Sequence, residues 1–221
     1  MPIDMQIDPE IFQITLLSLQ VSVLATFLSL LLGLPLGTLL ALGRFPGRSI
    51  LLSVVNTGMG LPPVVVGLFV AMSLWRSGPL GDLNLIYTPA AIVIAQVVIA
   101  FPVVTGLTTA ALQALEPGLQ FQLLGLGASR MQMTWMLWRE ARLPLLAGLM
   151  AGFGSVISEV GASMMVGGNI RYQTRVLTTA IVLETSKGDF NSAIGLAVLL
   201  LTITFLVNWG LTWIQQKAAK R

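Results

Sequence analysis

One carboxylate of this chain lies in a long apolar stretch, where a charge is unfavourable in free energy. Glu159 is the only ionisable residue between Leu143 and Ile170. A charge at the centre of a membrane-spanning helix costs about 2.5 to 3.5 kcal/mol on insertion scales, so such a residue usually faces a cavity or a partner. A carboxylate also repels anions. We therefore interpret Glu159 as a gating residue or an inter-helix hydrogen-bonding group; lining a polar pathway and proton coupling are the alternatives.

Prolines, glycines and small polar residues accompany Glu159 in two of the apolar runs. The further candidates for a pathway or gate are Pro62, Pro63, Ser158, Ser163, Gly167, Gly168 and Asn169. The two prolines free carbonyls that need a cavity or a neighbour, although a kink alone would explain them equally well. The hydroxyl and amide groups either face a pathway or bond carbonyls of their own helix. The two glycines either offer backbone N–H groups to an anion or end the helix.

Enzymatic chemistry has little support in this sequence. The chain contains no cysteine and no histidine, which removes disulfides, the commonest metal ligands and the usual base at neutral pH. Its lysines are Lys187, Lys217 and Lys220, and none belongs to a Gly-x-x-x-x-Gly-Lys-Ser/Thr phosphate loop. An intramembrane enzyme would need a nucleophile with a base, or a carboxylate pair. We predict no catalytic residue, no metal site and no cofactor on this chain.

The segment 116–142 is suited to docking a soluble protein. It contains Gly127-Ala128-Ser129-Arg130, and Pro144 follows seventeen positions after the glycine. Apolar residues recur there at helical spacing: Phe121, Leu124, Ala128, Met131, Trp135 and Trp138. We predict a helix within 120–133 that enters a groove of a partner, and the alternative is a helix that contacts only lipid headgroups. The predicted contact residues are Gln122, Leu124, Gly127, Ala128, Ser129 and Arg130.

The elements that must hold these residues are membrane-spanning helices. Hydrophobic residues make up 55% of the chain and charged residues 10%, whereas soluble domains are about 25% charged. A span needs about 20 apolar residues, and five charge-poor runs are long enough. We predict one all-α membrane domain over 11–216, with spans at about 14–43, 50–75, 86–113, 143–168 and 191–214, and with tails at 1–10 and 217–221. The pairs Gly33/Gly37 and Gly148/Gly152 have the spacing for close helix packing.

Basic residues in the loops predict the orientation, because cytoplasmic loops carry an excess of Lys and Arg. The residues on one side are Arg44, Arg48, Arg130, Arg139, Arg142, Lys217, Lys220 and Arg221, and those on the other are Arg76, Arg171, Arg175 and Lys187. The side with the larger group is predicted to be cytoplasmic, which places the N-terminus outside and the C-terminus in the cytoplasm. The net charge of +3 is small and dispersed, so nucleic acid is not an expected partner.

The order of these features resembles a known family. A Gly-Ala-Ser in a cytoplasmic loop, a Leu-Pro at the start of the next span and a five-span core are similar to the permease subunit of type I ATP-binding-cassette (ABC) importers. Phe121-Gln122-Leu123 replaces the family's Glu-Ala-Ala, and the interval from Gly127 to Pro144 is about one helical turn longer, which keeps the helical face. The segments 56–67 and 158–170 resemble tungstate-importer permeases, relatives of the molybdate and sulfate ones.

The resemblance implies partners and a location. We expect a homodimer of this subunit in a prokaryotic plasma membrane, two cytoplasmic ATPase subunits that bind ATP and Mg²⁺, and an extracytoplasmic binding protein that delivers an oxyanion. Tungstate is the expected substrate, and molybdate or sulfate is the alternative within the family. An ATP-independent channel is the alternative from a different class.

Overall fold

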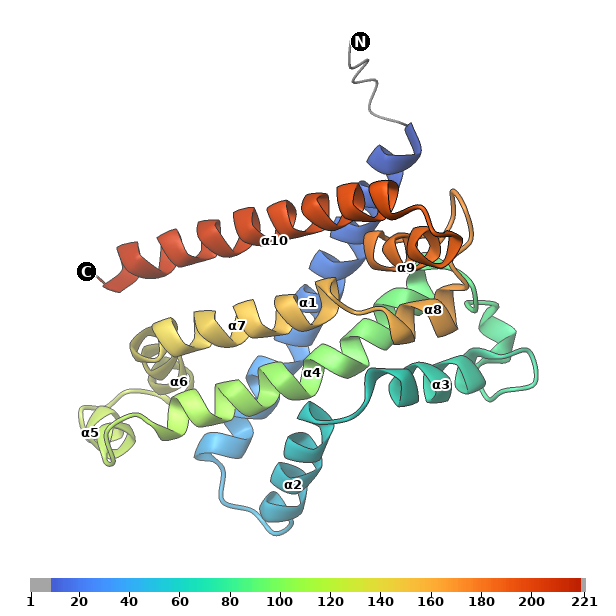
Figure 1. The fold of residues 1–221 in the computed structure, drawn as a ribbon. Coiled ribbons are helices and arrows are strands. Elements are labelled where there is room, and N and C mark those ends of the chain that lie inside the picture. Colours follow the sequence, from blue (N-terminus) through green and yellow to red (C-terminus); the bar gives the residue numbers. More distant parts are fainter. Residues whose placement is uncertain (1–8, 220–221) are drawn as a thin grey trace.

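The computed structural model describes residues 9–219, which fold into helices without any strand (Figure 1). The helices are α1 (Pro9–Leu42), α2 (Arg48–Met59), α3 (Pro63–Leu74), the 3₁₀ helix η1 (Gly81–Leu83), α4 (Pro89–Gln113), α5 (Leu119–Gly125), α6 (Arg130–Glu140), α7 (Arg142–Ile157), α8 (Gly161–Gly167), α9 (Leu177–Lys187) and α10 (Phe190–Ala219). Residues 1–8 and 220–221 of the predicted tails lie outside the described residues.

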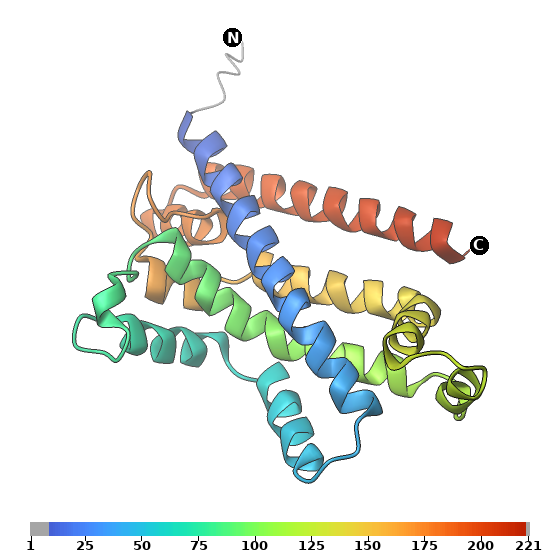
Figure 2. The same cartoon turned by 180° about the vertical axis from the view of Figure 1, so that it is seen from behind.

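The centre of the molecule is α4, which packs against α1 and α7. Figures 1 and 2 show α1 crossing α4 along much of its length. Both helices lie close to α4 because small residues face it: a Cβ atom built on Gly37 of α1 would lie 2.7 Å from the Thr105 carbonyl oxygen, and one built on Gly152 of α7 would lie 2.9 Å from Val104 Cγ2. These contacts confirm the close packing predicted from the two glycine pairs.

Three helices are long and apolar enough to cross a membrane, and two bent pairs raise the number to as many as five among the described residues. The predicted span 50–75 consists of α2 and α3, which meet at 104° where Pro62 and Pro63 lack backbone donors. The predicted span 143–168 is also interrupted, since α7 ends at Ile157 and α8 begins at Gly161. No proline marks that second break, and the sequence analysis did not predict it.

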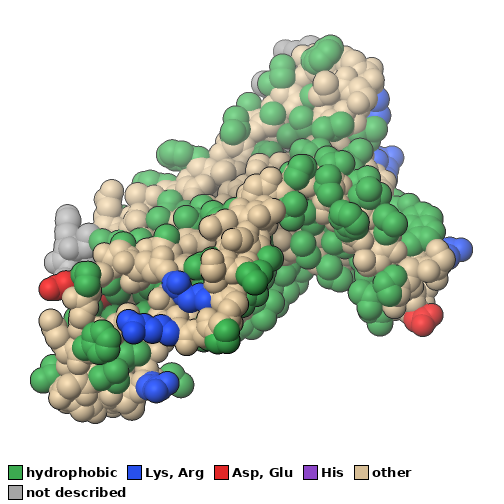
Figure 3. All heavy atoms as spheres, turned by 90° about the horizontal axis from the view of Figure 1, so that it is seen from below, with side chains coloured by type: hydrophobic (Ala, Val, Ile, Leu, Met, Phe, Trp, Pro, Cys, Tyr) green, Lys and Arg blue, Asp and Glu red, His purple; other side chains and the backbone are tan. Residues whose placement is uncertain are grey.

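Large apolar side chains remain exposed along the helices. In the most apolar part of α10 only 11% of the residues are buried, and Val198, Leu201, Phe205 and Trp209 are all more than half exposed. In Figure 3 hydrophobic side chains cover broad areas, whereas the charged ones gather toward the extremities. Such a surface suits lipid contact.

The molecule has two distinct ends. The N-terminal end contains the start of α1, the loop 168–176 and α9, because Glu10 forms ion pairs with that loop. The α5–α6 end contains α5, α6 and the last turns of α1 and α4, which share one apolar cluster. The helices α1, α4 and α7 connect the two ends.

Candidate functional site

The predicted gate residue Glu159 lies in the break between α7 and α8 and is 7% exposed. Its Oε1 accepts a hydrogen bond from the backbone N–H of Ala162 at 2.8 Å, so the carboxylate caps the first turn of α8. The backbone carbonyl of Glu159 accepts a hydrogen bond from Thr178 Oγ1 of α9 at 2.9 Å. The residue therefore holds its own break together and ties that break to α9.

Gln96 of α4 holds the same break from another side, and the sequence analysis missed it. Its side chain is 2% exposed, and Nε2 donates to the Val156 carbonyl at 3.2 Å. This carbonyl belongs to the last turn of α7, where carbonyl groups have no N–H partner four residues further along the helix. An amide inside a long apolar run is the signal that could have identified Gln96, because such a group needs a partner in the membrane.

The two breaks are close to each other because α3 packs against α8. A Cβ built on Gly67 would lie 2.6 Å from Ala162 Cα, and one built on Gly161 would lie 2.5 Å from Val64 Cγ2. The helix that follows Pro62-Pro63 is therefore in van der Waals contact with the helix that follows Glu159. The structure thus joins the two runs through neighbours of the predicted residues, and the prolines themselves are exposed.

The remaining predicted pathway residues differ in their surroundings. Ser158 is exposed, and its hydroxyl donates to the Gly154 carbonyl of its own helix at 2.7 Å. This bond agrees with the alternative in which the hydroxyl does not face a pathway. Ser163 is 1% exposed, and its Oγ has no hydrogen-bond partner. Gly168 has a φ of +69° and ends α8, so its role in the described fold is helix termination.

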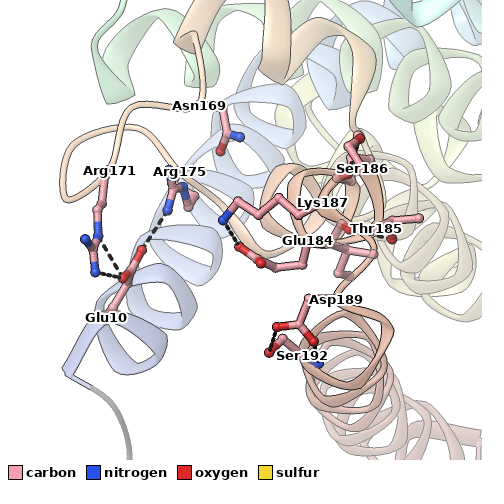
Figure 4. Close-up of polar contacts among 12 residues, drawn as sticks. Glu10, Asn169, Arg171, Arg175, Glu184, Thr185, Ser186, Lys187, Asp189 and Ser192 are labelled. Atoms are coloured by element: carbon pink, nitrogen blue, oxygen red, sulfur yellow. Dashed lines mark hydrogen bonds and ion pairs between the residues drawn. The ribbon is translucent and has the colours of Figure 1, made fainter.

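Asn169 lies in the loop 168–176, which is bound to the start of α1 (Figure 4). Its Nδ2 donates to the Thr179 carbonyl at 3.4 Å, and its buried Oδ1 has no hydrogen-bond partner. Glu10 accepts hydrogen bonds from Arg171 Nε at 2.8 Å and from Arg175 Nη1 at 2.7 Å. The loop that follows α8 is thus fixed to α1 by an ion-pair cluster of Glu10, Arg171 and Arg175.

The predicted docking segment contains two helices joined by a turn at 126–129. Gly127 has a φ of +86°, a conformation that favours glycine. Ser129 and Gln132 form a capping box, in which Ser129 Oγ accepts from the Gln132 N–H at 3.3 Å and Gln132 Oε1 accepts from the Ser129 N–H at 2.8 Å. The apolar spacing predicted a helix within 120–133, and the structure interrupts it at this turn.

One face of this segment is buried and the other is exposed. Leu123, Met133 and Leu137 pack against the ends of α1 and α4, and Trp138 Nε1 donates to Thr38 Oγ1 of α1 at 2.9 Å. The exposed large apolar side chains are Phe121 at 68%, Leu124 at 42%, Leu126 at 85%, Met131 at 81%, Trp135 at 60% and Met136 at 47%. Of the predicted contact residues, Gln122, Leu124, Gly127, Ser129 and Arg130 are exposed and Ala128 is half-buried. We call the six exposed apolar residues the apolar patch.

A family model described as "binding-protein-dependent transport system inner membrane component" matches residues 33–220. The chain belongs to this family. A probable anion ABC transporter permease protein from Haloferax volcanii is 40% identical over 200 residues, which cover 88% of this chain and 86% of the relative. The tungstate uptake system permease protein TupB from Peptoclostridium acidaminophilum is 39% identical over 203 residues, which cover 91% and 88%.

Solved structures of the MetNI methionine ABC transporter in inward-facing conformations share the fold. One has a TM-score of 0.74 at 19% identity and covers 95% of this chain and 94% of its own. As a member of the binding-protein-dependent transport family, the chain is a multi-pass membrane permease subunit that works with a separate ATPase and a substrate-binding protein. ATP is hydrolysed by that ATPase and not by this chain.

Proposed function

We propose that the chain is the permease of a tungstate importer. The observation that carries this proposal is the 39% identity to a tungstate uptake permease along 91% of the chain. The polar side chains around α8 support it, because Gln96, Ser163 and Asn169 are neutral. Neutral hydrogen-bonding groups bind an anion weakly enough to release it. Affinity then resides in the binding protein.

Uptake into liposomes tests this function. The permease is reconstituted with its ATPase and its binding protein, and tungstate uptake is measured with molybdate and sulfate as competitors. We expect ATP-dependent uptake for which tungstate competes best. If sulfate competes better than tungstate, sulfate is the substrate instead. Uptake of the anion without ATP would support a channel.

We also infer the assembly and its orientation. Two copies of the chain pair in the membrane, with the N-terminal end outside and the α5–α6 end in the cytoplasm. The excess of basic residues on the α5–α6 side supports this orientation. Because the sequence has no cysteine, a single cysteine at Thr185 or at Gln122 reports the side of each end through labelling by an impermeant maleimide. Labelling of Gln122→Cys from outside intact cells would contradict the orientation.

The apolar patch is the proposed contact with the ATPase. Each of two ATPase subunits binds ATP and Mg²⁺, and its closure moves α5 and α6 of one permease subunit. Leu123 and Leu137 of these helices share one apolar cluster with Leu112 of α4, and Trp138 donates a hydrogen bond to α1, so a push on the patch reaches both long helices. This contact route supports mechanical coupling from the ATPase to the spans.

The gate is proposed at the contact between α3 and α8. The break at Pro62-Pro63 and the break at Ser158-Glu159 give these two short helices separate connections to the rest of their spans. Ser163, Gly167, Gly168 and Asn169 belong to the moving segment in this proposal. Glu159 keeps α8 helical through its cap while the segment moves.

A further inference from the structure

Two buried polar atoms near the α7–α8 break have no hydrogen-bond partner. They are Gln96 Oε1 on α4 and Ser163 Oγ on α8, and their residues are 2% and 1% exposed. Buried polar atoms are nearly always paired, so an unpaired one calls for an explanation such as a second conformation. Both atoms lie on helices that contact each other.

The register of α4 and α8 places these two residues at the same level. A Cβ built on Gly167 would lie 2.9 Å from Ile92 Cδ1, so the end of α8 faces the first turn of α4. The two helices run in opposite directions, and residues four apart on a helix lie on one face. Ser163 lies four residues before Gly167 on α8, and Gln96 lies four residues after Ile92 on α4, so the two residues lie opposite each other. The bond from Gln96 Nε2 to Val156, in the last turn before the break, agrees with this register.

The amide of Gln96 has a donor and an acceptor, and only the donor is used. Its N–H bonds Val156, while its carbonyl oxygen is unpaired beside a helix that carries an unpaired hydroxyl. The Val156 carbonyl also accepts from the Glu159 N–H at 3.2 Å. The carbonyl oxygen of Gln96 can therefore take a partner on α8 while its N–H keeps the bond to α7.

We propose that Gln96 is a gate-positioning residue that gains a second partner during transport. In the conformation described here its N–H fixes the end of α7 against α4. When α8 moves about the break, the Ser163 hydroxyl donates to Gln96 Oε1 and holds α8 in its second position. This inference rests on the proposed gate at α3 and α8, and it does not depend on which anion is carried.

A reporter on α8 tests the second bond. Met164 is 36% exposed, and Met164→Cys introduces a unique thiol into a chain that has none. The complex with the ATPase is labelled with a maleimide without nucleotide and after trapping with ATP and vanadate. We expect the ratio of the two labelling rates to shrink by about fivefold in Gln96→Met and in Ser163→Ala, which is the effect of one hydrogen bond on a two-state equilibrium. The double variant is expected to match the single ones.

The matched control is Gln215→Met. Gln215 Nε2 also donates to a backbone carbonyl, that of Leu143 at 3.1 Å, but at the opposite end of α7. The proposal is overturned if Gln96→Met behaves like this control, or if Ser163→Ala leaves the ratio unchanged. Ser163→Ala removes one hydroxyl and decides the question alone if Gln96→Met does not assemble. Failure of the tungstate proposal would show in uptake and would leave the labelling ratio intact.

Discussion

Where α7 stops, the freed backbone groups find partners inside the chain, whereas α5 and α6 leave large apolar side chains uncovered. Val156 and Glu159 at the break accept hydrogen bonds from Gln96 of α4 and Thr178 of α9. At the other end, Leu126 and Met131 are more than four-fifths exposed. A self-satisfied break suits a part that moves within the subunit. An exposed apolar patch suits a surface that another molecule covers.

The largest expected effect comes from charging the apolar patch. Leu126→Asp should weaken binding of the ATPase by roughly 30-fold or more, because a central apolar anchor contributes about 2 kcal/mol or more to an interface. The residue is 85% exposed, so the permease itself should fold normally. Affinity for the purified ATPase is the measurement, with Thr185→Asp at the N-terminal end as the control. Equal affinities for both variants would remove the distinction between the two regions.

The packing of α3 on α8 predicts the next effect. Gly67→Ala should destabilise the permease by about 1 to 3 kcal/mol, because the added Cβ would lie 2.6 Å from the Ala162 backbone. Gly60→Ala is the matched control, since its Cβ would come no closer than 3.8 Å to the Thr57 carbonyl oxygen. Thermal unfolding in detergent compares the two. Equal losses of stability would mean that the α3–α8 contact is looser than described.

Two substitutions of Glu159 separate its role as a helix cap from a role of its negative charge. Glu159→Leu removes the acceptor for the Ala162 N–H, and we expect it to cost about 1 kcal/mol and to slow transport. Glu159→Gln retains an oxygen that accepts the same bond, so transport should stay within about twofold of the unchanged protein, a difference of under half a kcal/mol. ATP-driven uptake by both variants is the measurement that distinguishes the two roles. Loss of uptake in Glu159→Gln would favour proton coupling instead.

The smallest effect concerns the start of α10, where Asp189 precedes the helix. The Ser192 hydroxyl and then the Ser192 N–H donate to this carboxylate and lower its pKa. The bonds contribute stability above the unfolded pKa of about 3.9, and that contribution is lost as the pH falls through the lowered folded value. Melting temperatures of the unchanged protein and Asp189→Asn should therefore converge at acidic pH. Parallel curves would show that the carboxylate contributes nothing.

Several parts of the fold and site could be predicted from residues close together in the chain. The charge of Glu159 inside an apolar run, the Pro62-Pro63 pair and the Gly127-Ser129 turn each signal a local feature. The helix predicted within 120–133 corresponds to α5, but the turn that separates it from α6 was not predicted, because apolar spacing does not register the capping box of Ser129. The break in the fourth run was missed because its backbone partners, Gln96 and Thr178, come from other helices.

The sequence by itself determined that this is an all-helical membrane protein with long apolar runs and a polar segment between two of them. Composition and local turn chemistry suffice for that, because lipid requires each span to satisfy its own backbone. The tertiary structure decided where that rule is relaxed, since α7 can end inside the protein only where side chains of α4 and α9 supply the missing bonds. It also decided which apolar side chains of 119–140 are buried, because the ends of α1 and α4 cover one face and leave the other exposed.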